Sequence, residues 1–184
     1  MALKATIFKA ELNIADMDRH YYQSHALTIA RHPSETDERM LVRLLAFALN
    51  ASEALQFSKG LSTDDEPDIW QKDLSGGIEL WIDLGQPDEK RIRKACGRAR
   101  QVVIYCYSGS SADIWWRQMG DQLQRFANLS VINLPVHATR ELAGLAQRNM
   151  QLQCTVSEGT CWLADDTRSV QVEPMPWKRA EDGR

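Results

Sequence analysis

The sequence predicts an α/β fold: a compact mixed β-sheet with flanking helices, preceded by a long N-terminal β-hairpin. Residues 4–14 alternate between apolar and polar side chains, as a strand with one buried face does. Residues 101–107 (QVVIYCY) are a nearly continuous apolar run, which is typical of a central strand. Helical apolar patterns lie before and after this run, so helices and strands alternate along the chain.

Length and composition predict one domain. The chain has 184 residues, and we expect the domain to cover residues 1–172, with a loosely ordered tail over 173–184. A net charge of −3 excludes a strongly basic coat for nucleic acid but not a local basic patch. No apolar run approaches the length of a membrane span and the N-terminus is no signal peptide, so we expect a cytoplasmic protein without a membrane partner.

The first fifty residues predict a hairpin followed by a helix. The alternating strand, a turn at 15–18 and a returning strand at 19–31 make the hairpin. Ser34 and Asp37 resemble a capping box, so a helix is expected from there to about Ser52. Glu38 lies one turn before the apolar stripe of this helix. It either faces the core or its edge, or is a first-turn acid that the helix dipole favours.

The remaining chain predicts a second hairpin and then alternating helices and strands. A polar loop is expected over 60–66. The elements expected after it are a hairpin (67–86), a helix (88–98), a strand (101–107), a helix (111–127), a strand (129–134), a helix (139–149) and a hairpin (151–156 with 160–163). Helical crossovers of this kind join parallel strands of one sheet.

The hairpin over 67–86 carries carboxylates where a sheet favours β-branched residues. A two-residue turn at 75–76 would place three pairs on one face: Asp68–Asp83, Trp70–Trp81 and Lys72–Glu79. Two carboxylates about 5 Å apart repel by about 3 kcal/mol at an effective dielectric near 20. Protonation of one acid, or a cation between them, removes this cost. Otherwise both acids point into water at a sheet edge.

Several features of this region resemble the core of the PD-(D/E)XK nucleases. They are an acid on the preceding helix, Pro67-Asp68 at the start of a strand, and a return strand that ends near Asp83, followed by a helix and a strand. In that superfamily, two acids hold a divalent metal that activates water for attack on a phosphodiester. The resemblance implies that Asp68 and Asp83 bind Mg²⁺ or Mn²⁺ and that Glu38 orients a metal-bound water.

One position departs from this pattern. Gly85 stands where the superfamily has a lysine that stabilises charge. The resemblance then implies that Lys90 or Lys94, on the next helix, supplies the positive charge and that Gln86 positions the water or a phosphate. Loss of activity is the alternative.

Three long stretches resemble the YaeQ family of small bacterial proteins. They are residues 1–22 (MALKATIFKAELNIADMDRHYY), 30–51 (ARHPSETDERMLVRLLAFALNA) and 79–99 (ELWIDLGQPDEKRIRKACGRA). The family is a compact variation on the PD-(D/E)XK fold, so the resemblance implies that fold. It implies no particular activity.

A basic stripe follows the second hairpin. Arg91, Lys94 and Arg98 share one face of the helix expected over 88–98. Such a stripe beside a metal site can bind the phosphates of a nucleic acid. A solvated helix face is the other interpretation.

Two functions follow from the sequence. The first is Mg²⁺- or Mn²⁺-dependent phosphodiester hydrolysis by a nuclease-like protein, which the acid pair favours. The second is a non-catalytic nucleic-acid- or protein-binding module that kept the nuclease-like fold, which Gly85 and the acidic net charge favour.

Overall fold

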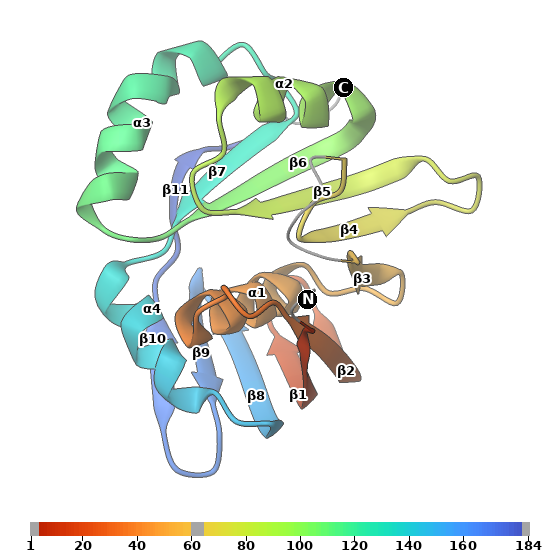
Figure 1. The fold of residues 1–184 in the computed structure, drawn as a ribbon, viewed down its shortest axis with the longest axis vertical. Helices are drawn as coiled ribbons and strands as arrows, with labels where there is room; N and C mark the ends of the chain where they lie inside the picture. The colour runs from red at the N-terminus through yellow and green to blue at the C-terminus, as the bar shows by residue number, and fades with distance from the viewer. Residues whose placement is uncertain (1–3, 60–64, 182–184) are drawn as a thin grey trace.

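A computed structural model describes residues 4–59 and 65–181, which form two mixed β-sheets and four α-helices. The elements are stacked in layers (Figure 1). Helices α2 and α3 cover one face of a six-stranded sheet, α1 and α4 lie between the two sheets, and a five-stranded sheet closes the opposite side. The α/β class is confirmed. The expectation of a single sheet is wrong, because a side-chain pattern gives a strand's faces but not its neighbours.

The five-stranded sheet contains both predicted terminal hairpins. Its order is β10-β9-β8-β1-β2. The strands are β1 (Thr6–Asp16), β2 (Tyr21–Arg31), β8 (Asn149–Ser157), β9 (Thr160–Ala164) and β10 (Ser169–Val172). β1 pairs with β2 in an antiparallel register and with β8 in a parallel one. The alternation of β1 places Phe8, Ala10, Leu12 and Ile14 in the core between the sheets.

The six-stranded sheet has the order β11-β7-β6-β5-β4-β3. Its strands are β3 (Leu55–Phe57), β4 (Ile69–Lys72), β5 (Ile78–Leu84), β6 (Ala99–Cys106), β7 (Leu129–Asn133) and β11 (Met175–Lys178). β5, β6 and β7 are parallel, and α2 (Glu89–Arg98) and α3 (Ser110–Leu123) connect them. The predicted helical crossovers are therefore confirmed. The short strands β3, β10 and β11 were not predicted.

Helix α1 (Asp37–Asn50) is buried on all sides. All nine residues from Met40 to Ala48 are buried, because the two sheets enclose the helix. Its N-cap is Thr36, whose hydroxyl accepts a hydrogen bond from the backbone N–H of Arg39. The predicted cap, Ser34, is wrong by two residues, since Ser34 instead bonds to the ring of His32.

The structure confirms the predicted central pair of the second hairpin. Trp70 lies opposite Trp81, with ring centroids 6.4 Å apart in an edge-to-face contact. Ile69 and Ile82 lie opposite each other and pack into the core around α1. The expected alternation of faces holds in this part of the hairpin.

The turn of this hairpin is longer than the predicted two residues. The backbone N–H of Asp73 donates to the carbonyl of Gly77, and the carboxylate of Asp73 accepts from the N–H of Gly77. A register shift follows, so that Lys72 lies opposite Ile78 and not opposite Glu79. Asp73 is thus a turn-capping acid, which explains one carboxylate of this hairpin.

Two expectations for the C-terminal third are corrected. The helix expected over 139–149 is α4 (Val136–Leu142) with a 3₁₀ turn (Ala143–Leu145), because Asn149 already pairs with β1. The tail expected to be loose from residue 173 contributes β11, which pairs with β7. Lys178 is buried there and donates to the carbonyls of Phe126 and Leu129.

Most of the acidic loop expected over 60–66 lies outside the described residues. Within the part of the chain that the structure describes, no helix is both long and apolar enough to cross a membrane. The four cysteines are free, and burial raises the pKa values of the Cys106 and Cys154 thiols to about 12.

The position of α1 between two sheets can be tested by shortening one of its buried side chains. Leu44 is fully buried, so Leu44→Ala should lower the free energy of unfolding by about 2–5 kcal/mol. Leu74→Ala is the control, since Leu74 is fully exposed at the tip of the second hairpin and should change it by less than about 0.5 kcal/mol. Urea unfolding measures both. Equal effects of the two substitutions would contradict the layered core.

Candidate functional site

Asp68 lies where the ladder between β4 and β5 ends. Its backbone N–H donates to the carbonyl of Ile82 at 3.1 Å, and its Oδ2 accepts from the backbone N–H of Leu84 at 2.9 Å. The carboxylate thus replaces a backbone acceptor at the end of the ladder. Its Oδ1 accepts from Nη2 of Arg39, on α1, at 2.8 Å. Both oxygens are engaged, and the side chain is only 9% exposed.

Asp83, near the end of β5, points to the side of the sheet that α2 covers. Its Oδ2 accepts from Nε1 of Trp81 at 3.1 Å and from Nε of Arg91 at 2.9 Å. Its Oδ1 accepts from Nη2 of Arg91 at 3.0 Å. The two-pronged arginine contact is among the stronger hydrogen-bonded arrangements in proteins. Asp83 is therefore a buried carboxylate whose two oxygens are both satisfied.

The two acids have their partners on opposite faces of the six-stranded sheet. Arg39 belongs to α1, which packs with Ile82, whereas Arg91 belongs to α2, which packs with Trp81. Each carboxylate is neutralised by its own guanidinium group. A divalent cation shared by both acids would have to displace at least one arginine, so the residues as arranged do not fit such an ion. No group of three or more His, Cys, Asp or Glu side chains in the described ranges is arranged to hold a metal. Metal binding by Asp68 and Asp83 stays a prediction.

A buried ion network extends from Asp68 into α1. The carboxylate of Glu35 has no exposed surface and accepts from Arg39 Nη1 at 2.8 Å and from Arg43 Nη2 at 2.7 Å. Although burial opposes the change, the carboxylates of Asp68 and Glu35 raise the pKa of Arg39. This network therefore consists of two carboxylates and two guanidinium groups.

Glu38 lies on the same side of the sheet as this network. Its Oε2 accepts from the hydroxyl of Thr139, on α4, at 3.2 Å. The pKa of Tyr107, just past β6, is raised mainly by burial; Arg39 lowers it, while Glu38, Asp68 and Glu35 raise it. Glu38 and Asp68 thus both influence the pKa of Tyr107, which lies just past the carboxyl end of β6. Glu38 is half-buried and bonds to a neighbouring helix, as an acid at the edge of the core does.

The predicted stand-ins for the missing lysine point elsewhere. Nζ of Lys94 lies 2.6 Å from Oδ1 of Asp65, and Lys90 is exposed. Gln86 donates to the hydroxyl of Ser111 at 2.9 Å. The cations that contact Asp68 and Asp83 are Arg39 and Arg91, and Gly85 adopts a left-handed backbone with φ of +97°.

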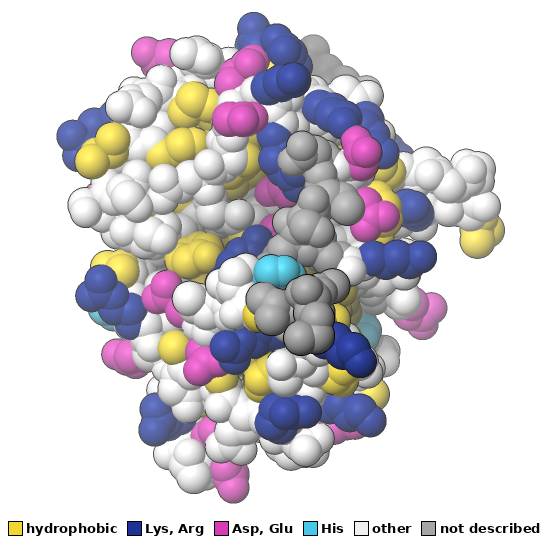
Figure 2. All heavy atoms as spheres, viewed as in Figure 1, with side chains coloured by type: hydrophobic (Ala, Val, Ile, Leu, Met, Phe, Trp, Pro, Cys, Tyr) yellow, Lys and Arg dark blue, Asp and Glu magenta, His cyan; other side chains and the backbone are white. Residues whose placement is uncertain are grey.

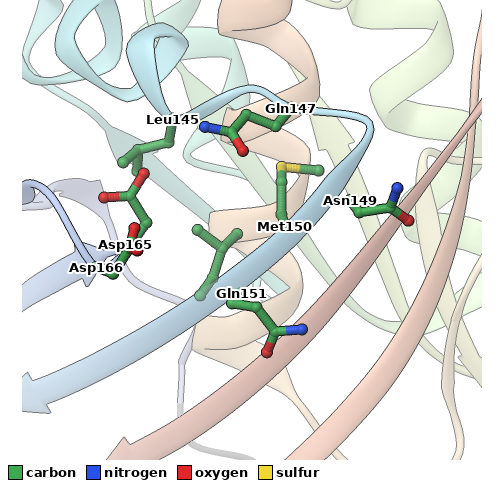
Figure 3. Close-up of a pocket in the computed structure, with 8 residues that line it drawn as sticks. Leu145, Gln147, Asn149, Met150, Gln151, Asp165 and Asp166 are labelled. Carbon is green, nitrogen blue, oxygen red and sulfur yellow. The ribbon is translucent and has the colours of Figure 1, made fainter.

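A hollow of about 330 Å³ lies in the other half of the molecule, beside β8 (Figure 3). Asp165 and Asp166 line one side of it, and Asn149 and Gln151 point away from them. The carboxylate of Asp165 accepts hydrogen bonds within its own turn, from Thr167 among others. Asp165 therefore stabilises its own turn. None of the predicted site residues lines this hollow.

Comparison with known proteins decides the family. The family model described as YaeQ protein matches residues 1–174. The chain belongs to the YaeQ family. Curated YaeQ relatives from Escherichia coli (strain K12) and Salmonella typhi are each 48% identical over 179 residues, which is 97% of this chain and 99% of theirs. Both carry the name "Uncharacterized protein YaeQ".

Solved structures of the YaeQ family have the same fold. The crystal structure of YaeQ protein from Xanthomonas axonopodis pv. citri is similar with a TM-score of 0.92 and 49% identity, over 97% of this chain and 99% of that one. The YaeQ protein from Pseudomonas syringae is similar with a TM-score of 0.91 and 35% identity, over 95% and 97% of the two chains. The resemblance seen in the sequence is thereby confirmed for the family.

Sequence reasoning missed the arginines of this site. Arg39 and Arg43 are four residues apart on one face of α1, and Glu35 lies four residues before Arg39, just ahead of the N-cap Thr36; this spacing could have indicated ion pairs. Arg91 was assigned to phosphates, but it holds Asp83. This contact crosses from a helix to a strand, and no local spacing predicts it.

The role of Asp83 can be tested by stability. Asp83→Asn removes the charge that faces Arg91, so we expect the free energy of unfolding to fall by about 1–3 kcal/mol, less than for a fully buried pair because Arg91 is 26% exposed. Glu79→Gln removes the same charge from the same strand, where Glu79 faces the exposed Arg100 at 3.6 Å. It should cost less than about 1 kcal/mol.

Urea unfolding of both variants without metal gives the comparison. If Asp83→Asn instead made the protein more stable, repulsion between the acids would outweigh the arginine contacts described above.

Proposed function

We propose that the chain is a non-catalytic nucleic-acid-binding module built on a nuclease-like core. The order of elements supports the core: α1, the antiparallel strands β3, β4 and β5, the crossover helix α2 and the parallel strand β6. This order is similar to that of the PD-(D/E)XK nucleases. By the resemblance of the sequence, Asp68 and Asp83 would correspond to the metal-binding acids of that superfamily.

One observation carries the non-catalytic assignment: each of these acids is bound by an arginine. Arg39 binds Asp68, and Arg91 binds Asp83 through two nitrogens. Arginine keeps its proton at any accessible pH, so it does not leave a carboxylate by deprotonation. The third catalytic position is occupied by Gly85, which has no side chain. Of the groups needed for metal-assisted hydrolysis, the two acids are therefore paired with arginines and the lysine is missing.

The surface that supports binding is α2. Residues 88–100 contain six of the 22 Lys and Arg residues of a chain whose net charge is −3. Figure 2 shows Lys and Arg side chains gathered at the end of the molecule where Figure 1 places α2, with acidic side chains between them. Lys94 and Arg98 lie on the exposed side of α2. Such a stripe attracts a phosphate backbone without reading its sequence.

A second candidate is Mg²⁺- or Mn²⁺-dependent phosphodiester hydrolysis. The observation that favours it is that Glu38 adjoins Arg39 in the first turn of α1 and that Arg39 binds Asp68, so two carboxylates lie at the same end of this helix. Both predicted metal ligands bind arginine in this structure, so this hydrolysis would require a metal ion to displace an arginine.

Binding tests the first function. At low salt, fluorescence anisotropy should detect binding of single-stranded DNA or RNA. Near physiological salt the dissociation constant should be on the order of 10⁻⁵ M, and the slope of log K against log salt should be about −1.4 for two phosphate contacts, at Lys94 and Arg98. Arg98→Ala should weaken binding several-fold. Arg140→Ala, on the exposed side of α4, is the matched control and should leave it unchanged. The proposal fails if the two variants bind alike or if no nucleic acid binds.

Metal separates the two candidates. If the module is non-catalytic, Mn²⁺ should leave the melting temperature of the protein and of Asp68→Asn equally unaffected, and neither should cleave DNA or RNA. Differential scanning fluorimetry and a gel assay measure the two quantities. A melting temperature that rises with Mn²⁺ only in the unmutated protein, together with cleavage that Asp68→Asn abolishes, would establish the second candidate instead.

A further inference from the structure

The residues that would bind phosphate on α2 already have an acceptor within the chain. Nζ of Lys94 lies 2.6 Å from Oδ1 of Asp65, and Nη1 of Arg98 donates to the backbone carbonyl of Asp65 at 2.8 Å. Nη2 of Arg91 donates to the backbone carbonyl of Glu66 at 3.0 Å. Two consecutive residues therefore engage all three cations of the predicted stripe.

This segment has a fixed course over α2. The carboxylate of Glu66 accepts from the backbone N–H of Lys59 at 3.2 Å, which ties the segment to the residues just after β3. Pro67 and Asp68 follow directly, and Asp68 is bound to Arg39 and to Leu84. The segment is thus held at Glu66 and at Asp68, and Asp65 is placed over Lys94 and Arg98.

The contacts resemble those of a nucleic-acid backbone. A row of oxygen acceptors, one of them a full negative charge, runs along a helix face that carries three cations. The hydrogen bond from Lys94 and the positive charge of Lys94 lower the pKa of Asp65. This carboxylate therefore remains ionised and stays paired with the Lys94 ammonium group.

We propose that Asp65 and Glu66 act as an intramolecular competitor that occupies the phosphate-binding stripe of α2. This inference rests on the proposed function and names how the same surface is regulated. Binding of a polyanion requires that its phosphates replace Asp65 at Lys94 and Arg98. Arg91 stays on Asp83 during this exchange, since that contact is largely buried.

The ion pair between Asp65 and Lys94 is weak, so a phosphate group can replace Asp65. Lys94 is 48% exposed and Asp65 is 78% exposed, so the ion pair is screened by water and salt. The carboxylate therefore lowers the affinity for a ligand without closing the surface. Removing it should tighten binding by about two- to five-fold, the range that exposed ion pairs give.

Asp65→Asn tests this proposal, because it removes the charge and keeps the shape of the side chain. Asp166→Asn is the matched control: it makes the same change of net charge at an exposed residue of the other sheet, in the turn between β9 and β10. Anisotropy with a labelled single-stranded oligonucleotide should show two- to five-fold tighter binding for Asp65→Asn than for Asp166→Asn. The difference should shrink as salt rises.

A double-mutant cycle assigns the gain to Lys94. Once Lys94→Met has removed the ammonium group, Asp65→Asn should bring little further gain, whereas a general charge effect would persist. If the oligonucleotide binds and Arg98→Ala weakens it, but Asp65→Asn equals Asp166→Asn, the competitor is disproved and the proposed function stands. If no protein binds the oligonucleotide, both proposals fall.

Discussion

The site depends on the buried ion pairs of Glu35. Its carboxylate has no exposed surface and binds Arg39 and Arg43, which lie further along in α1. An uncompensated buried charge costs several kcal/mol, so these pairs restrict how α1 can turn between the two sheets. Arg39 also binds Asp68, and Asp68 holds the backbone N–H of Leu84. The start of α1 thereby sets the place where β4 begins and β5 ends, and with it the end of the parallel strands at which the site lies.

Electrostatic magnitudes explain why the acids of the second hairpin are tolerated. At an effective dielectric near 20, two carboxylates about 5 Å apart repel by about 3 kcal/mol, whereas a carboxylate and a guanidinium about 4 Å apart attract by about 4 kcal/mol. Asp68 and Asp83 each have such a guanidinium, on opposite faces of the sheet. Two arginine contacts therefore outweigh the repulsion. Neither a bound cation nor a protonated acid is required to keep these carboxylates in place.

The sequence predicted what depends on local pattern and missed what depends on distant contacts. The alternation of residues 6–16, the Trp70–Trp81 pair and the helical crossovers were correct, because each follows from side-chain period or from chain connectivity. The division into two sheets was missed, since β1 pairs with β8 more than 130 residues away, as in Lys9 and Asn149. The resemblance to nucleases pointed to Asp68 and Asp83. It did not point to their partners, because Arg39 and Arg91 lie on two helices that no local sequence spacing links to these acids.

The residues that pair with Asp68 and Asp83 are arginines and not lysines, and this affects how firmly the two acids are held. A lysine has a flexible stem, and its pKa shifts readily when it is buried. A guanidinium keeps its charge and binds a carboxylate through two nitrogens, as Arg91 does with Asp83. Acids that are neutralised in this way need no metal ion to offset their charge. Protein contacts then help to position α2, because Arg91 connects Asp83 with the backbone carbonyl of Glu66. On the proposed function, the arginine that binds Asp83 in place of a metal also holds the backbone of the acidic segment beside the phosphate-binding stripe.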